Sequence, residues 1–208
     1  MDSEENRRGW ANRSNKYSPA YYANIGPNAV SETLVTIFDH YVPTSAAVLE
    51  VGCSSGRHLE CLRRAGYTNL TGLDLNPDAF DVMADRYPTL AEIGSFHVGA
   101  MEDLLSEFAA DQFDAVYAVE TLQHVHPTET WVFEELKRIT ADLLVTAENE
   151  GNSPRRGRGD ERVSVVDDGE REFPLYHREW KAVFSELGLA QLLVKSTTRD
   201  TIRVFRKL

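Results

Sequence analysis

The feature that most constrains the fold is an alternation of short apolar runs with amphipathic segments in the middle of the chain. Five runs have the composition of buried strands, and they cover residues 46–51, 69–75, 93–99, 113–119 and 142–147. The segments between them carry apolar residues at helical spacing, and proline opens two of these segments. Strands that alternate with helices in this way predict a parallel sheet with helices packed on its faces.

The rest of the chain extends this core within a single domain of 208 residues. A helix is predicted over residues 19–25, with Ser18 as its N-cap and Gly26 as its end, and a second over residues 28–41. The first 16 residues are polar and carry no predicted element. We divide the domain into an N-terminal helical cap, a cofactor-binding core, a long loop containing a hairpin, and a closing helix with two antiparallel strands, at residues 1–42, 43–147, 148–176 and 177–208.

Charge and cysteine content limit the partners and the location. The chain has 33 acidic and 22 basic residues, and this balance argues against a nucleic-acid partner because phosphate-binding surfaces are basic. No apolar run approaches the length of about 20 residues that a membrane helix needs, so no membrane partner is expected. The two cysteines, Cys53 and Cys61, are too few for a disulfide framework and make a poor metal site. We therefore expect a cytoplasmic protein without a bound metal.

A glycine turn follows the first predicted strand, in the stretch VLEVGCSSGRH. Ligands of open parallel sheets bind beyond the carboxyl ends of the strands, which is where this turn lies. Arg57 and His58 stand where a P-loop needs lysine and a hydroxyl residue, so a nucleoside triphosphate is excluded. A dinucleotide site needs a middle glycine, and Ser54 occupies that place. A turn without any ligand and a turn for S-adenosylmethionine are the other interpretations.

Two acidic residues favour S-adenosylmethionine over NAD. Glu50 ends the first strand, where a buried carboxylate needs a partner; a cationic amino acid would serve, whereas a pyrophosphate would be repelled. Asp74 ends the second strand, about twenty residues after the turn, where an acid accepts hydrogen bonds from both ribose hydroxyls.

These motifs resemble those of the class I S-adenosylmethionine-dependent methyltransferases, in particular their small-molecule branch, over residues 46–147. VLEVGCSSG resembles the first family motif, GLDLNP the second, VGAMEDL the segment after the third strand, and FDAVYAVETLQHV the fourth-strand motif. Ala100 departs from the aspartate that many relatives carry. The resemblance implies a cofactor site formed by Glu50, Gly52, Cys53, Ser54, Gly56, Asp74, Leu75, Met101, Glu102, Val119 and Glu120.

The resemblance also implies a Rossmann-like, doubly wound α/β fold with seven strands, mostly parallel, whose last strand is antiparallel. The expected activity is methyl transfer from S-adenosyl-L-methionine to oxygen, nitrogen or carbon of a small-molecule acceptor. The alternatives are an RNA or protein methyltransferase and a module that binds the cofactor without turnover. A nicotinamide-dependent oxidoreductase is a more distant alternative.

Candidate catalytic residues lie near the expected methyl acceptor. His124 and His126 follow the fourth strand, where either could act as a base or orient the acceptor, or else cap and pack locally. Tyr21 is a third candidate on the N-terminal helix; because Tyr21 and Tyr22 are adjacent on that helix, at most one can face the site.

Several other residues have two interpretations. Arg155, Arg156 and Arg158 would bind an anionic acceptor or lie in a solvated loop. Glu148, Asn149 and Glu150 end the fifth strand, where they could meet a cationic acceptor. Trp131, Trp180 and Cys61 are predicted to be core residues.

Overall fold

The computed structural model describes residues 1–151, 163–166 and 173–208, and contains a seven-stranded sheet in the order β3-β2-β1-β4-β5-β9-β8. β1 to β5 pair in parallel, and β9 is antiparallel to both of its neighbours. The predicted fold class is therefore confirmed, including the antiparallel last strand. The strands are β1 (Ala47–Val51), β2 (Asn69–Asp74), β3 (Ser95–Val98), β4 (Phe113–Val119), β5 (Thr140–Glu148), β8 (Leu189–Ser196) and β9 (Thr201–Lys207).

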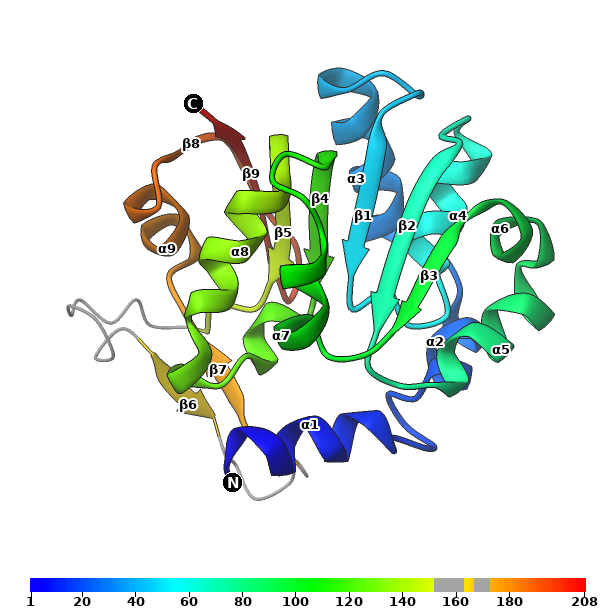
Figure 1. Ribbon diagram of the computed structural model, residues 1–208, viewed down its shortest axis with the longest axis horizontal. Helices are drawn as coiled ribbons and strands as arrows, with labels where there is room; N and C mark the ends of the chain where they lie inside the picture. The colour runs from blue at the N-terminus through cyan, green and yellow to red at the C-terminus, as the bar shows by residue number, and fades with distance from the viewer. Residues whose placement is uncertain (152–162, 167–172) are drawn as a thin grey trace.

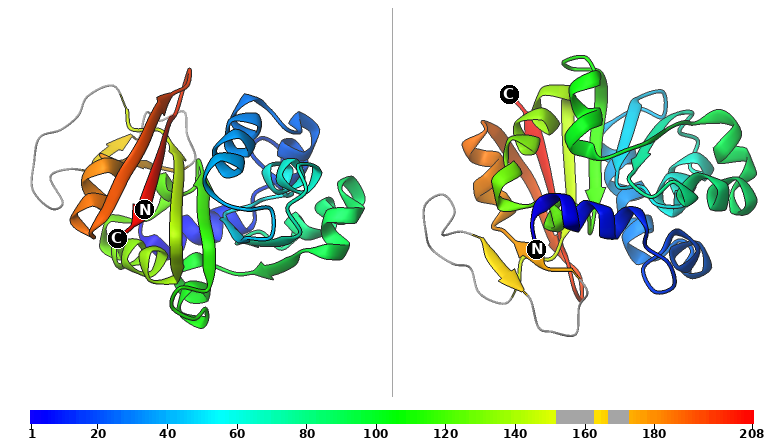
Figure 2. Two further views of the ribbon diagram at one scale, coloured as in Figure 1. Left: turned by 90° about the horizontal axis from the view of Figure 1, so that it is seen from above. Right: turned by 60° about the horizontal axis from the view of Figure 1, so that its bottom comes forward.

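Helices cover both faces of this sheet and give three layers (Figures 1 and 2). Two buried clusters fill the space between the layers, one beneath α3 and α4 and one beneath α8 and α9. The helices are α1 (Ser3–Ala11), α2 (Pro19–Ile25), α3 (Ala29–Tyr41), α4 (Arg57–Arg64), α5 (Asp78–Arg86), α6 (Pro88–Ile93), α7 (Met101–Leu104), α8 (Trp131–Ile139) and α9 (Trp180–Glu186).

The strand order reverses between β1 and β4, because the chain winds outward from these neighbours in both directions. Successive side chains of a strand alternate between the faces of a sheet, so Glu50 shares a face with Val48 while Leu49 belongs to the opposite core cluster. Tyr117 of β4 lies beside Glu50 in the parallel register. This places a carboxyl group in the core, next to the point where a doubly wound sheet binds its ligand.

The N-terminal segment differs from the sequence prediction, because α1 occupies residues that carried no predicted element. A capping box begins this helix: Asp2 accepts a hydrogen bond from the Glu5 amide, and Glu5 accepts one from the Asp2 amide. Figure 1 shows α1 lying across the carboxyl ends of the parallel strands. The cap over the sheet therefore has two parts, α1 and the correctly predicted α2, which begins after Ser18 and ends at Gly26.

Three predictions were wrong, two about burial and one about the length of a helix. The Trp131 side chain is 42% exposed, because α8 begins at this residue after a separate 3₁₀ turn at Pro127–Glu129. Cys61 is half-buried at the edge of α4 and not a core residue. The helix that the sequence predicts over residues 101–110 ends at Leu104 and continues as a 3₁₀ turn at Leu105–Glu107. Trp180, by contrast, is fully buried as predicted.

The connection after β5 holds a short strand pair. β6 (Ser164–Val166) runs antiparallel to β7 (Leu175–His177). The sequence predicted a hairpin within residues 148–176, and residues 152–162 and 167–172 of that loop, Arg155, Arg156 and Arg158 among them, lie outside the described residues.

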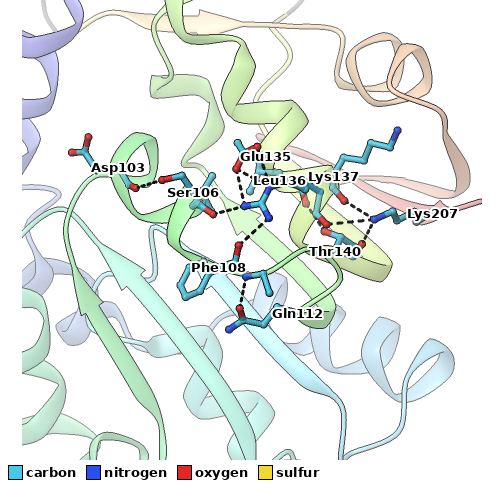
Figure 3. Close-up of polar contacts among 12 residues, drawn as sticks. Asp103, Ser106, Phe108, Gln112, Glu135, Leu136, Lys137, Thr140 and Lys207 are labelled. Carbon is cyan, nitrogen blue, oxygen red and sulfur yellow. Dashed lines mark hydrogen bonds and ion pairs between the residues drawn. The ribbon is translucent and has the colours of Figure 1, made fainter.

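Polar contacts fasten the ends of α8 and β9 far from the glycine turn. The Lys207 ammonium donates to the carbonyl oxygens of Thr140 and Lys137, at 2.9 and 3.2 Å (Figure 3). Arg138 donates to the carbonyl oxygens of Phe108 and Leu105, both at 2.9 Å.

Across the described ranges, every helix is too short or too polar to cross a membrane.

Candidate cofactor and acceptor site

A cavity lies at the carboxyl edge of the sheet, between the strand ends and the N-terminal helices α1 and α2. The sheet side supplies Glu50, Gly52, Cys53, Ser54, Arg57, His58, Leu73, Asp74, Leu75, Asn76, Gly99, Ala100, Met101, Glu102, Val119, Glu120, Thr121, His124 and Val125. The cap supplies Asn6, Arg7, Trp10, Arg13, Tyr17, Pro19 and Tyr22. The structure thus brings together every predicted cofactor residue except Gly56.

The glycine turn adopts a backbone that side chains would disturb. Gly52 has a φ of +71°, and a Cβ atom there would lie 2.3 Å from the Thr121 hydroxyl oxygen. Gly56 has a φ of +76°, and a Cβ atom there would meet the side chains of Met83 and Leu90 at 2.7 and 2.9 Å. Gly56 therefore lets α4 pack on α5 and α6, whereas Gly52 forms the wall of the cavity.

Replacing Gly52 by alanine should destabilise the protein by about 1–3 kcal/mol, because the left-handed backbone is strained and Cβ collides with Thr121. Gly66→Ala is the matched control: its φ is +100°, but the nearest atom to its Cβ would be 3.8 Å away. Chemical denaturation should show the larger loss for Gly52→Ala. Equal losses in the two variants would contradict a packing role for Gly52.

Asp74 connects the turn to the second strand. Its two carboxylate oxygens accept hydrogen bonds from the amides of Ser54 at 2.7 Å and Asn76 at 2.8 Å. Burial raises the pKa of Asp74, and these amide hydrogen bonds oppose that rise. Each carboxylate oxygen retains a second lone pair, so Asp74 can still accept hydroxyl hydrogens from a ligand in the cavity.

Glu50 is a nearly inaccessible acid in the wall of the cavity, with 1% of its surface exposed. Burial raises the pKa of its carboxyl to about 8, although the Tyr117 hydroxyl donates to it at 2.9 Å and Arg57 lies nearby. An acid with this pKa gains its charge readily when a cation binds beside it. Glu50 therefore suits the ammonium group of an amino-acid ligand.

Arg57 is a buried cation. From the sequence, this residue served only to exclude a P-loop, and no role in binding was predicted for it. Its guanidinium lies over the Tyr22 ring at 4.8 Å. Within the described part of the chain it forms no hydrogen bond and no ion pair, and it lines the cavity. A buried cation needs an anionic partner, so Arg57 can bind a carboxylate of a ligand.

The opposite end of the cavity lies under β3 and α7. Met101 and Glu102 begin α7, and Ala100 before them is buried. Burial raises the pKa of Glu102, and the Arg7 guanidinium of α1 approaches its carboxylate to 3.9 Å. Glu102 is thus the acid in this part of the cavity that could accept hydrogen bonds from a planar polar ligand.

Val119 and Glu120 border the cavity where β4 ends. Glu120 has a φ of +51°, and its amide donates to the Ala147 carbonyl at 2.9 Å. Its carboxylate pairs with Arg199 of the turn between β8 and β9 at 3.1 Å. This strained residue is held from two sides, as is common at ligand sites.

Of the candidate catalytic residues, His124 alone lines the cavity. Its ring centroid lies 4.4 Å from that of Trp10. His126 caps the following 3₁₀ turn, with Nδ1 2.7 Å from the Thr128 hydroxyl, and so lies outside the lining. Tyr21 also lies outside it, whereas its neighbour Tyr22 lines the cavity.

The acids that end β5 do not face the cavity. Glu148 is fully buried and accepts hydrogen bonds from the amides of Thr121, Leu122 and Gln123; burial raises its pKa to about 8, against the effect of these amides. Glu150 pairs with Arg203 at 2.6 Å. The hypothesis that they meet a cationic acceptor is therefore wrong for these two residues.

Sequence reasoning missed Asn6 and Trp10, which reach the cavity because α1 is helical. The spacing of Asp2 and Glu5, an acid followed three residues later by glutamate, was the signal that could have revealed this helix.

Among the described residues, no group of three or more His, Cys, Asp or Glu side chains could hold a metal ion.

Comparisons with known proteins agree with this geometry. Residues 48–142 match the family model described as a methyltransferase domain. We found no curated protein with significant sequence similarity to the chain. Geranyl diphosphate C-methyltransferase from Streptomyces coelicolor A3(2) has a similar structure, with a TM-score of 0.71, 15% identity, and coverage of 99% of this chain and 98% of its own.

Two other solved structures share the fold. The 1,6-didemethyltoxoflavin-N1-methyltransferase of Burkholderia thailandensis has a TM-score of 0.66 at 16% identity, over 86% of this chain and 78% of its own. Magnesium protoporphyrin IX methyltransferase from Synechocystis PCC 6803 has a TM-score of 0.64 at 13% identity, over 99% and 91%. Residues 48–142 thus match a methyltransferase domain, and the chain as a whole shares its fold with these solved methyltransferases.

Proposed function

We propose that the protein transfers the methyl group of S-adenosylmethionine to oxygen, nitrogen or carbon of a small-molecule acceptor. The observation that carries this proposal is the single cavity wall that joins Glu50, the glycine turn and Asp74, and that faces α1. Glu50 would hold the ammonium of the cofactor and Asp74 its ribose hydroxyls. Leu75, Met101 and Glu102 would contact the adenine, with Cys53 and Ser54 contributing backbone groups.

Arg57 completes this assignment by binding the carboxylate of the methionine part. Arg57→Leu should therefore weaken S-adenosylhomocysteine binding by about 10- to 100-fold, the loss expected for a charge-assisted hydrogen bond. 5′-Methylthioadenosine lacks the amino-acid group and should bind the variant and the unaltered protein alike. Calorimetric titration of both ligands checks this, and an equal loss for the two ligands would refute the carboxylate contact.

The acceptor would lie between α1 and the turn that carries His124. Among the described residues, the buried Asn6 Oδ1 and Trp10 Nε1 atoms have no hydrogen-bond partner, although both residues line the cavity. Buried polar atoms need partners, so a polar acceptor is supported. Two of the similar structures are named as methyltransferases of small molecules, an N-methyltransferase and a C-methyltransferase.

Bound S-adenosylmethionine supplies an activated methyl group, so the protein has to position the acceptor and exclude water. Residues of α1 and α2 line the cavity opposite the strand ends, so these two helices would perform the second task. His124 faces the acceptor side and could take a proton from a hydroxyl or ring nitrogen. For a carbon acceptor, His124 would only orient the substrate.

We also propose a cytoplasmic location and a division of the chain at residues 1–42, 43–147, 148–176 and 177–208. Both cysteines are free, which is consistent with a reducing compartment.

The proposal is tested by identifying the class of molecule that receives the methyl group. The protein is incubated with methyl-labelled S-adenosylmethionine and with the small-molecule, RNA and protein fractions of a cell extract in turn. Label in the small-molecule fraction is the expected result. Label in RNA or protein would identify the acceptor class as wrong, and binding without any transfer would favour a non-catalytic module.

A further inference from the structure

The turn from Thr121 to Val125 is held by a buried acid at the end of β5. Glu148 has no exposed surface, and its carboxylate accepts hydrogen bonds from three successive amides, those of Thr121 at 3.1 Å, Leu122 at 2.9 Å and Gln123 at 3.2 Å. These are amides that a 3₁₀ turn leaves without partners, so Glu148 fixes the start of the turn.

A buried cation holds the other side of the same turn. Arg178 is 3% exposed and donates to the carbonyl oxygens of Leu122 at 3.4 Å and Val125 at 2.6 Å. Its guanidinium also lies within 6 Å of the ring centroids of Phe133, Tyr176 and Trp180, which prevent it from moving toward solvent. The amides of one short turn are thus bound by the carboxyl group of Glu148, and its carbonyls by the guanidinium of Arg178.

The turn from Thr121 to Val125 also holds the N-terminal helix α1. The Asn6 side-chain amide of α1 donates to the His124 carbonyl at 2.9 Å, and the Trp10 ring packs on the His124 imidazole. No residue of α1 belongs to either core cluster. The position of α1 over the cavity therefore depends on contacts such as these, and the position of His124 depends on Glu148 and Arg178.

We propose that Glu148 and Arg178 are positioning residues for the acceptor side of the site: they fix the turn that presents His124 and receives α1, without contacting the cofactor. This inference rests on the proposed function, because it assigns the His124 side to the acceptor. It explains why a carboxylate and a guanidinium are buried near a cavity that neither of them lines.

The test uses the full chain labelled with 5-fluorotryptophan, with the Trp10 signal assigned through Trp10→Phe. Fluorine NMR follows this signal in Glu148→Gln and in Asn6→Ala, and calorimetry measures S-adenosylhomocysteine binding. Glu150→Gln is the matched control, two residues away in an ion pair with Arg203. Asn6→Ala removes the hydrogen bond between α1 and the turn and leaves the cores intact, so it tests the link between α1 and the turn if Glu148→Gln does not fold.

The Trp10 signal should shift toward that of a solvent-exposed indole in both variants and stay in place in the control, while S-adenosylhomocysteine affinity changes less than about threefold. Methyl transfer to the small-molecule fraction should fall about tenfold or more in Glu148→Gln, with KM for S-adenosylmethionine unchanged. An unshifted Trp10 signal in Asn6→Ala, or a loss of affinity equal to the loss of transfer in Glu148→Gln, would overturn the proposal. Failure of the unaltered protein to bind S-adenosylhomocysteine would instead overturn the proposed function.

Discussion

Replacing Glu50 by glutamine is expected to make the free protein more stable at pH 8 and to weaken its cofactor binding. Burial raises the pKa of Glu50 from 4.5 to about 8, so the folded protein holds a proton that the unfolded chain releases between these values. The free energy of unfolding therefore falls as the pH rises from about 4.5 to 8. Glutamine carries no charge at any pH and removes this loss.

The expected gain for Glu50→Gln is about 1–3 kcal/mol at pH 8 and close to zero at pH 5, because the amide keeps a carbonyl oxygen for the Tyr117 hydroxyl. Denaturant titrations at both pH values measure it, with the exposed Glu107→Gln as the control. S-adenosylhomocysteine affinity should fall about tenfold or more, because the ligand ammonium loses its carboxylate. A gain independent of pH, or unchanged affinity, would contradict the role given to Glu50.

Replacing Asp74 by alanine should reduce S-adenosylhomocysteine affinity by about 100-fold or more, because two effects combine. The ribose hydroxyls lose their acceptor. The Ser54 and Asn76 amides also lose theirs, so the glycine turn loosens.

The matched control for this prediction is Asp78→Ala, four residues on in the exposed first turn of α5. The control should bind the ligand as the unaltered protein does, and circular dichroism should confirm that both variants are folded. Retention of affinity in Asp74→Ala would place the ribose elsewhere in the cavity.

Local signals in the sequence were enough to predict much of the fold. Ser18, Pro19 and Gly26 each favour one position of a helix, and α2 has the predicted bounds. β4 likewise covers the predicted residues, since a buried parallel strand is a continuous apolar run bounded by polar residues. The glycine turn was predictable because the backbone at Gly52 and Gly56 is left-handed, and glycine is the residue that adopts this conformation most readily.

Features that depend on tertiary contacts were not predictable in this way. The apolar spacing around Trp131 is helical, but it does not reveal that the helix begins at that residue and leaves the ring exposed. Adjacent tyrosines cannot both face the site, yet only the packing of α2 selects Tyr22 over Tyr21. From the sequence, Glu148 is an acid at the end of a strand, a position typical of a ligand-binding residue. Its partners are instead backbone amides, which no sequence pattern shows.

The measurement that tests the central claim most directly is calorimetric titration of the unaltered protein with S-adenosylmethionine, S-adenosylhomocysteine and NAD. The account predicts micromolar binding of both adenosyl ligands and no binding of NAD, since the cavity joins an acid for an ammonium and an acid for a ribose. Binding of NAD alone, or of none of the three, would contradict it and leave only the fold established.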